Sequence, residues 1–300
     1  MQQRATREAF RVDNARVSVD HYENFPVASL LCPPRLRPAV AAIYWFARTA
    51  DDLADEGDVP AAQRLADLAA YRADLLAVAA GNPPGPRWQG VFTRLGPVIA
   101  EWSLPLRPFT DLLSAFEQDV TKHRYRDRAE LLDYCRRSAD PVGRLLLHLY
   151  RVDDADALRQ SDAICSALQL INFWQDLRID LQRGRIYLPL DDCERHRVDA
   201  DALLACRPGP ALNGLLADEV DWARGLMAQG APLVHRIGGR AGWELRLVVQ
   251  GGLRILDHIA ARGFDTLAQR PRLGARDALP MLWRALRMRS DGGVLAGAAR

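Results

Sequence analysis

The sequence lacks any apolar run long enough to cross a bilayer. Its 300 residues contain no uninterrupted window of about 18 apolar residues. The first ten residues, MQQRATREAF, also lack the apolar core of a signal peptide. We therefore expect a cytoplasmic protein with no membrane-spanning segment.

Cysteines at metal-binding or redox spacing are absent as well. None of the five cysteines forms a CxxC, and none has a histidine at the spacing of a zinc site. We interpret them as buried, reduced thiols of an intracellular protein. They are Cys32, Cys135, Cys165, Cys193 and Cys206.

An excess of charge of one sign is also missing. The chain has 40 basic and 38 acidic side chains, so we expect no nucleic-acid partner. Lysine is almost absent, because Lys122 is the only one and the other basic side chains are arginines. The planar guanidinium of arginine suits paired hydrogen bonds to phosphate oxygens, although a GC-rich genome would produce the same bias.

Alternating strand patterns do not extend beyond a few residues, whereas the helical period occurs throughout. From Leu36 to Ala47, apolar side chains recur at i, i+4, i+7, i+8 and i+11, which places them on one helix face. The period predicts helices at 36–55, 59–81, 87–104, 107–122, 127–151, 156–184, 209–237, 240–262 and 274–288.

The breaks between these segments are short and rich in proline and glycine, as in NPPGP at 82–86 and RPGP at 207–210. None is long enough to link two domains. We therefore predict an all-α fold, a single domain over 15–290 with its helices around a central cavity. We expect a flexible N-terminus at 1–14 and a disordered tail at 291–300.

Two aspartate clusters stand on the predicted helices. Asp51, Asp52 and Asp55 lie in RTADDLADE, and Asp176 and Asp180 lie in NFWQDLRID. Within each cluster an i, i+4 pair projects two carboxylates from one helix face. Taken alone, either pair is equally typical of the solvated face of an exposed helix.

The surroundings of the second pair favour a buried site. Gln169 and Asn172 extend the same line upstream along a helix that is otherwise apolar. Buried carboxylates without partners are costly, and like charges one turn apart repel each other. The two pairs make physical sense if they face each other across a cavity and hold hard cations. Mg²⁺ is the natural choice, because it takes carboxylates together with phosphate oxygens, and Mn²⁺ is the alternative.

A diphosphate also needs donors besides the metal. Arg48 stands one turn before Asp51 and suits a forked contact with phosphate oxygens; the alternative is an ion pair within its own helix. His21 and Tyr187 are further candidates for phosphate contacts. Metals and arginine at a leaving pyrophosphate favour ionisation. Aromatic faces stabilise the resulting cation, for which we select Tyr44 and Tyr134, although aromatics at helical spacing are typical of plain core too.

These motifs resemble the squalene/phytoene synthase family, which has the isoprenoid synthase fold. The similar stretches are AIYWFARTADDLADE at 42–56, DYCRRSADPVG at 133–143 and QLINFWQDLRIDLQRGRIYLP at 169–189, with HYENF at 21–25. The resemblance covers roughly residues 15–288. It makes 15–290 the catalytic domain of a magnesium-dependent enzyme in isoprenoid biosynthesis that acts on a prenyl diphosphate.

The resemblance also assigns the candidate residues to roles. It implies a metal region at Asp51, Asp52, Asp55, Asn172, Asp176 and Asp180. It implies a substrate pocket lined by His21, Tyr44, Arg48, Tyr134, Gln169 and Tyr187. We expect catalysis to depend on the four paired aspartates together with Arg48 and Tyr134.

Several residues depart from the family pattern. Tyr22 and Asn24 replace serines, Gln175 replaces an arginine, and Gly252 stands where many members have a pocket tyrosine. Together with SADPVG, these changes resemble the hydroxysqualene synthases of bacterial hopanoid pathways. That branch ionises presqualene diphosphate and captures the rearranged cation with water, which implies no NADPH. The sequence has no dinucleotide-binding fingerprint either.

Two other functions remain open from the sequence. One is a head-to-head prenyltransferase that joins two farnesyl or geranylgeranyl diphosphates. The other is a non-catalytic family member that acts as an assembly factor or lipid-binding scaffold. Besides the prenyl diphosphate, the expected partners are other enzymes of the pathway and the inner face of the membrane, through peripheral contact.

Overall fold

The computed structural model describes residues 32–288, and every regular element within them is helical. One isolated β-bridge joins Arg124 to Ile186. The prediction of an all-α fold is confirmed. The helices are α1 (Arg37–Asp55), α2 (Ala61–Ala79), α3 (Gln89–Trp102), α4 (Leu106–Asp119), α5 (Arg128–Ser138), α6 (Asp140–Leu149), α7 (Ala155–Gln182), α8 (Leu190–Arg195), α9 (Ala200–Leu204), α10 (Pro210–Gly230), α11 (Gly239–Ala261) and α12 (Ala278–Leu286).

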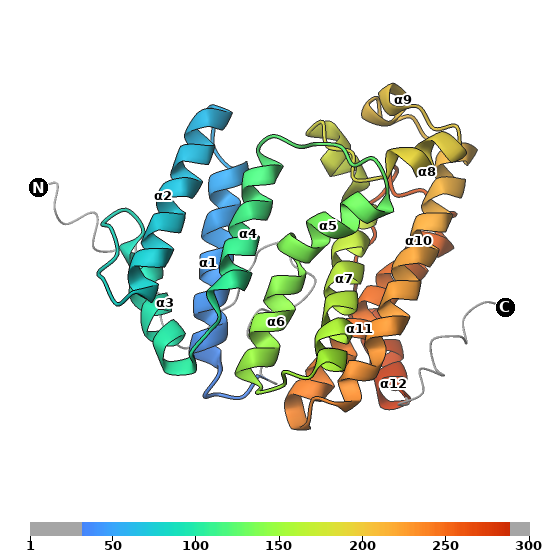
Figure 1. Cartoon of the computed structure of the whole chain (residues 1–300). Coiled ribbons are helices and arrows are strands. Elements are labelled where there is room, and N and C mark those ends of the chain that lie inside the picture. The colour runs from blue at the N-terminus through green and yellow to red at the C-terminus, as the bar shows by residue number, and fades with distance from the viewer. Residues whose placement is uncertain (1–31, 289–300) are drawn as a thin grey trace, which may run out of the picture.

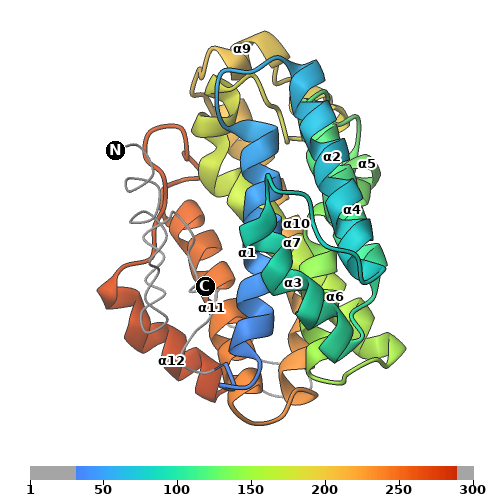
Figure 2. The ribbon, with the colours of Figure 1, turned by 90° about the vertical axis from the view of Figure 1, so that its left-hand side faces the viewer.

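The helices form two groups that lie side by side in Figure 1. On the left, α1 packs against α2, α3 and α4, and on the right the long α7 packs against α10 and α11. Helices α5 and α6 lie between the groups, where α6 contacts both α4 and α7. The ribbon turned by 90° shows α11 and α12 to the left of α1 (Figure 2). The site described below lies between these groups.

Each group has its own hydrophobic core. The core of α1 to α4 is centred on Phe46, whose ring lies 5.2 Å from Tyr71 and 5.1 Å from Phe109 between ring centroids. The larger core joins α5, α7, α10 and α11 and includes the fully buried Trp174. Burying rings of this size supplies much of the stability of each group.

The ends of α7 follow from its sequence. The side chain of Asp154 caps its first turn by accepting a hydrogen bond from the Ala157 amide at 2.9 Å. After Gln182 the chain turns at Gly184, where φ is +76° and a side chain would be strained. The chain then runs beside the segment that follows α4, where the Ile186 amide donates to the His123 carbonyl at 2.8 Å. This turn carries Arg183 and Arg185 to the end of α1.

The segment 127–151 is two helices, so the prediction of one helix there is wrong. α5 ends at Ser138 and α6 begins at Asp140, with Pro141 in its first turn. Proline has no amide hydrogen for a continuous helix and restricts the residue before it. The predicted helix over 209–237 likewise ends at Gly230 and continues as a short 3₁₀ helix, Ala231–His235. Helices α8 and α9 were not predicted, because six and five residues are too few to show a helical period.

Asp140, at the start of α6, is a buried carboxyl away from the aspartate motifs. It is 5% exposed and accepts a hydrogen bond from Ser166 Oγ at 2.9 Å. Burial, together with the charge of Asp162, raises its pKa to about 7. A carboxyl whose pKa is raised on folding contributes stability below its unfolded pKa, and that contribution is lost as the pH rises toward 7.

Asp140→Asn is therefore expected to flatten the pH dependence of stability. At pH 7.5 we expect the variant to exceed the wild type by about 1–2 kcal/mol in the free energy of unfolding, with little difference at pH 4. Urea unfolding at a series of pH values measures this, and Asp153→Asn, at an exposed position, is the control. Parallel pH profiles for Asp140→Asn and the wild type would contradict the prediction.

Within residues 32–288 no helix combines the length and the apolar character needed to cross a bilayer. The expected flexible N-terminus at 1–14 and disordered tail at 291–300 lie outside the described residues. So does His21, together with the rest of HYENF.

Candidate active site

The first aspartate cluster forms the last turn of α1, and Arg48 lies against it. Arg48 Nη2 is 2.7 Å from Asp52 Oδ1 and 2.9 Å from Glu56 Oε1, and its Nη1 is 3.3 Å from Asp51 Oδ2. The guanidinium is thus paired within its own helix, which is the alternative weighed for it from the sequence. Its role toward phosphate stays a prediction.

Asp51 is crowded by acidic neighbours. Burial, followed by the nearby charge of Asp55, raises its pKa to about 6 even though Arg48 acts in the opposite direction. A carboxyl in this position gains from any cation that approaches it.

Asp55 connects the two halves of the molecule. Arg185, from the turn after α7, binds it with both guanidinium nitrogens, one of them 2.9 Å from Asp55 Oδ2. Arg183 adds a longer contact at 3.4 Å. Burial acts to raise the pKa of Asp55, but the hydrogen bond and charge of Arg185 outweigh it, and the pKa is lowered. The end of α1 is therefore fastened to the end of α7.

The second pair lies on the last two turns of α7. Asp176 is held by a fork from Arg270, whose Nη2 is 3.0 Å from Asp176 Oδ2. Burial raises the pKa of Asp180 to about 7, and the charges of Asp176 and Asp55 act in the same direction. The negative charges of both motifs therefore act on Asp180, as expected for two pairs that face each other.

Gln169 and Asn172, which the sequence placed on the same face of α7 as Asp176 and Asp180, are also accessible. Gln169 is partly buried and Asn172 is exposed, whereas the apolar side chains beside them, such as Ile171 and Trp174, are buried. This accessible polar strip agrees with the 3, 4, 4 spacing read from the sequence. The structure thus aligns Gln169, Asn172 and both aspartates along one face of α7.

Tyr134 and Tyr187 belong to an aromatic cluster beside the carboxylates. Tyr187 stacks on Phe173 with 3.8 Å between ring centroids, and Tyr134 lies 6.2 Å from both rings. Tyr125 completes the cluster, 5.4 Å from Tyr134. These ring faces form an apolar wall next to the end of α7. Tyr44, by contrast, lies on α1 with its ring edge-on to Trp45 at 5.4 Å.

Asp119, at the end of α4, is a site residue that the sequence did not indicate. The Tyr134 hydroxyl donates a hydrogen bond to its Oδ2 at 2.8 Å, and the carboxyl is 8% exposed. Burial raises its pKa to about 7, and the charges of Asp55 and Asp51 also act on it. No motif surrounds Asp119, so only an expectation that α4 ends at the site could have found it.

The donor set suits a hard divalent cation that binds together with a phosphate. Four carboxylates and one amide oxygen line facing helices, and Mg²⁺ is usually bound by one or two carboxylates plus phosphate oxygens and water. Among the described residues, however, no three acidic, histidine or cysteine side chains converge as a ready metal cluster. Arg48, Arg185 and Arg270 each form an ion pair with a different carboxylate. The residues therefore fit a cation shared between a carboxylate pair and a diphosphate.

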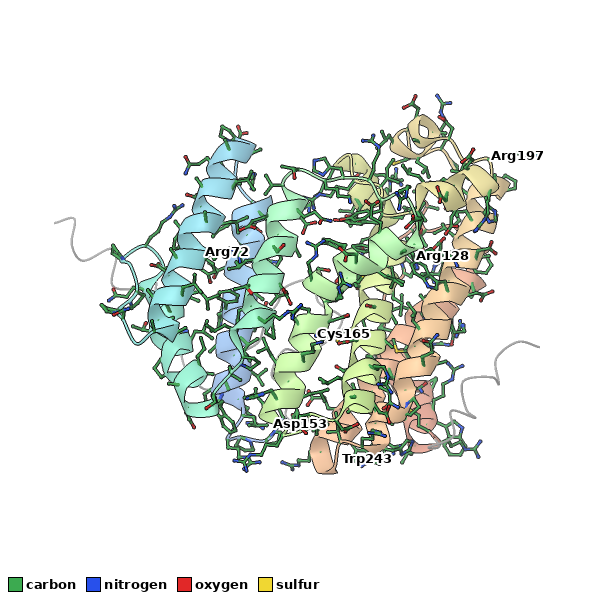
Figure 3. All side chains as sticks on the ribbon, in the orientation of Figure 1. Arg72, Arg128, Asp153, Cys165, Arg197 and Trp243 are labelled. Carbon is green, nitrogen blue, oxygen red and sulfur yellow. The ribbon has the colours of Figure 1, made fainter. Side chains whose placement is uncertain are left out.

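An apolar cavity of about 260 Å³ lies farther along the same helices. Its walls come from α1, α6, α7 and α11, and include Val40, Leu146, Leu168 and Leu245. Cys165, labelled on α7 in Figure 3, lines it as well. From Leu168 to Asp176 is eight residues of helix, or about 12 Å. The cavity wall at Leu168 and the carboxylate of Asp176 are thus about two turns apart along α7.

Two glycines lie where neighbouring helices of this region approach each other closely. At Gly143 a Cβ atom would lie 2.4 Å from Ser161 Oγ, so α6 approaches α7 closely there. At Gly252 a Cβ would lie 3.0 Å from Leu168 Cδ2 and from Met227 Cε. At Gly252, α11 therefore lies close against side chains of α7 and α10.

Gln175 has a structural partner away from the polar strip. It is 1% exposed, and its Nε2 donates to the Pro271 carbonyl at 2.6 Å. This bond holds the segment after α11 against α7, next to Arg270. Arg185 and Arg270 were not singled out from the sequence, because their partners lie 130 and 94 residues away.

The arrangement is suited to one kind of chemistry. Carboxylates and four arginines stand where α1 and α7 end, an aromatic cluster lies beside them, and an apolar cavity lies about two turns away along α7. Charged groups of this kind suit a diphosphate, and an apolar cavity suits a hydrocarbon chain.

Comparison with known proteins gives consistent matches over most of the chain. The sequence pattern of the squalene/phytoene synthase family matches residues 19–277. A hydroxysqualene synthase from Rhodopseudomonas palustris is 35% identical over 253 residues, covering 84% of this chain and 83% of that protein. A presqualene diphosphate synthase from the same organism is 30% identical over 267 residues, covering 86% and 91%.

A solved structure shows the same fold. The squalene synthase from Alicyclobacillus acidocaldarius superposes with a TM-score of 0.75 at 40% sequence identity. The superposition covers 81% of this chain and 90% of that one.

Proposed function

Because the chain belongs to the squalene/phytoene synthase family, we propose that it ionises a prenyl diphosphate, and specifically that it converts presqualene diphosphate and water to hydroxysqualene and pyrophosphate. One observation carries the proposal: carboxylates of both motifs act on one another where α1 and α7 end, and an apolar cavity lies farther along the same two helices. A prenyl diphosphate has the same division into a charged head and a hydrocarbon chain.

The charged residues would hold the head group. Asp51 and Asp55 on α1, and Asn172, Asp176 and Asp180 on α7, supply oxygen ligands for Mg²⁺, with Mn²⁺ as the alternative. When bound, such a cation neutralises the diphosphate and stabilises pyrophosphate as it leaves. Arg48, which already lies at this rim, is the arginine expected to contact phosphate oxygens in a fork.

The apolar parts of the site would protect the cation that remains. The rings of Tyr134, Phe173 and Tyr187 form a wall beside the carboxylates, and aromatic faces stabilise a passing cation. Water then attacks the rearranged cation, a carbon–oxygen bond forms, and the water loses a proton. No hydride donor takes part in this reaction, so NADPH is not required.

Similarity to a hydroxysqualene synthase supports this reaction. The identity to a hydroxysqualene synthase, 35%, exceeds the 30% to a presqualene diphosphate synthase. Gln175, where the family pattern has an arginine, donates to a backbone carbonyl, so it adds no cation for a second diphosphate. The head-to-head prenyltransferase therefore remains the second candidate.

Incubation with each of two candidate substrates tests the proposal. Purified protein with Mg²⁺ and without NADPH is given farnesyl diphosphate alone, and presqualene diphosphate alone. We expect no product from the first and a C30 alcohol from the second, identified by mass spectrometry of the lipid extract. Conversion of farnesyl diphosphate alone to presqualene diphosphate or a C30 hydrocarbon would establish the prenyltransferase instead. No pyrophosphate release from either substrate would favour a non-catalytic scaffold.

Arg48→Lys is expected to lower kcat/KM for presqualene diphosphate by about 10- to 100-fold with little change in thermal stability. A lysine keeps the charge beside Asp51 and Asp52 but cannot form a fork on phosphate oxygens. Steady-state kinetics measure the loss. Arg72→Lys is the control, because Arg72 pairs with Glu117 on α4, away from the carboxylates. Unchanged kinetics would leave Arg48 as a helix ion pair only.

A further inference from the structure

Helix α12 presents an apolar stripe to the outside of the molecule. The four side chains stand at i, i+3, i+4 and i+7, so they share one face, while Ala285 on the opposite face is fully buried. Figures 1 and 2 show α12 at the edge of the fold beside α11. The outer stripe consists of Leu279, Leu282, Trp283 and Leu286, which are 77%, 46%, 56% and 62% exposed.

Exposed arginines border the outer stripe. Of the five arginines from Gln269 to Met288, Arg270 is held by Asp176 and Arg284 by Asp257, whereas Arg276 and Arg287 are exposed. The segment contains a single acidic residue, Asp277. Asp277 is 5% exposed and is already paired with Arg254 at 2.7 Å, so it does not offset the surface charge. The Arg287 guanidinium lies 4.0 Å from the centre of the Trp283 ring. The stripe is thus an apolar surface with a cationic border.

The start of α11 extends this surface and links it to the cavity. Trp243 is 42% exposed, near the lower edge of Figure 3, and Arg246 lies over its ring at 5.2 Å. Arg246 also donates to the Ala285 and Met288 carbonyls at 3.1 and 3.2 Å, which fastens α12 to α11. Leu245, on the same turns of α11, lines the apolar cavity. One helix therefore separates the stripe from the cavity.

We propose that the outer stripe of α12, together with Trp243, docks on an anionic lipid bilayer. A helix that carries leucine and tryptophan on one face and arginine at its borders lies in the plane of the interface, with its apolar face among the acyl chains. Tryptophan favours the headgroup level, and arginine is attracted to anionic lipid. This docking would place the cavity beside the bilayer, and it holds whichever prenyl diphosphate the enzyme takes.

Vesicle binding by the full chain tests the proposal without any turnover. Wild-type protein is sedimented with vesicles of phosphatidylcholine alone or mixed with phosphatidylglycerol. We expect binding that depends on phosphatidylglycerol and weakens in high salt. The pair Leu282→Glu/Leu286→Glu should lower the partition coefficient on the order of a hundredfold, because two carboxylates enter the apolar face. Val59→Glu/Leu76→Glu is the matched control, because it adds the same charge at exposed apolar side chains elsewhere. Val59 precedes α2 and is 43% exposed, and Leu76 lies on α2 and is 48% exposed.

Two other occupants of the stripe, a second copy of the protein or another part of the same chain, would give different results. If the wild type is a dimer by light scattering and the Leu282/Leu286 pair is a monomer, a second copy covers the stripe and the proposal is wrong. If the pair lowers Tm by more than about 2 °C, the chain itself covers it, because substitutions on a free surface change stability little. Equal binding by the pair, its control and the wild type would also overturn the proposal.

Discussion

Asp180→Asn is expected to lower turnover of presqualene diphosphate by about a thousandfold or more while leaving the protein at least as stable as the wild type. The loss follows because asparagine offers a cation a neutral oxygen in place of a carboxylate, in a site where charge stabilisation is the main contribution to the rate. The stability follows from the crowding of Asp180 by Asp176 and Asp55.

The pH dependence gives the stability effect a definite sign. Because folding raises the pKa of Asp180 to about 7, its favourable contribution below pH 4 is lost as the pH rises through 7. Asparagine does not titrate, so the variant should melt higher than the wild type at pH 8 and close to it at pH 5. Pyrophosphate release with Mg²⁺ and thermal melts at both pH values measure the two effects.

Asp162→Asn is the control for Asp180→Asn, because Asp162 lies on the same helix but pairs with Arg144 away from the site. It should keep nearly all of its activity. Near wild-type turnover by Asp180→Asn would remove Asp180 from the metal region, and equal losses in both variants would point to damage of α7 rather than of the site.

Arg185→Met is expected to have the largest effect on stability of any substitution at the site, about 2–4 kcal/mol, together with loss of activity. The guanidinium binds Asp55 through both terminal nitrogens, and its charge opposes the rise in pKa that burial causes at Asp119 and Asp180. Its removal leaves three partly or fully buried carboxyls without their main positive neighbour. Urea unfolding at pH 7 measures the loss.

A second measurement separates the charge effect from a packing effect. If carboxylate repulsion is the cause, Mg²⁺ with pyrophosphate should raise the Tm of Arg185→Met more than that of the wild type, because binding to the folded state stabilises it. Arg144→Met removes a comparable but more exposed ion pair and should change stability by less than about 1 kcal/mol. A loss in Arg185→Met no larger than in Arg144→Met would contradict the assigned role.

The sequence predicts the fold well because helical periodicity is a local property. The apolar faces of α1 and α7 could be read directly, and so could the i, i+4 pairs of aspartates on them. The family resemblance read from the same motifs is confirmed by the comparisons, which match residues 19–277. The break between α5 and α6 was missed because the apolar spacing continues across Pro141, whereas the backbone cannot.

The partners of the site residues could not be predicted in the same way. Asp119 meets Tyr134 across 15 residues, whereas Arg270 and Arg185 meet Asp176 and Asp55 across 94 and 130 residues, so these contacts form only after the chain has folded back. Nothing in the sequence around Asp119 distinguishes it from a surface aspartate at a helix end. The pairing of Arg48 with Asp51 and Asp52 was weighed from the sequence, since it is local, and its geometry is seen in the structure.

The division into two hydrophobic cores has a consequence for how the chain folds as it is synthesised. The buried residues of the core of α1 to α4 run from Cys32 to Leu113, with only Leu145 and Leu149 added from α6. A nascent chain of about 150 residues therefore contains every side chain of that core, whereas the second core needs residues up to Met288. Since domains emerge from the ribosome N-terminus first, the Asp51 helix should be packed before the Asp176 helix has its partners. Hydrogen exchange of the native protein should then show two cooperative units, one for each hydrophobic core.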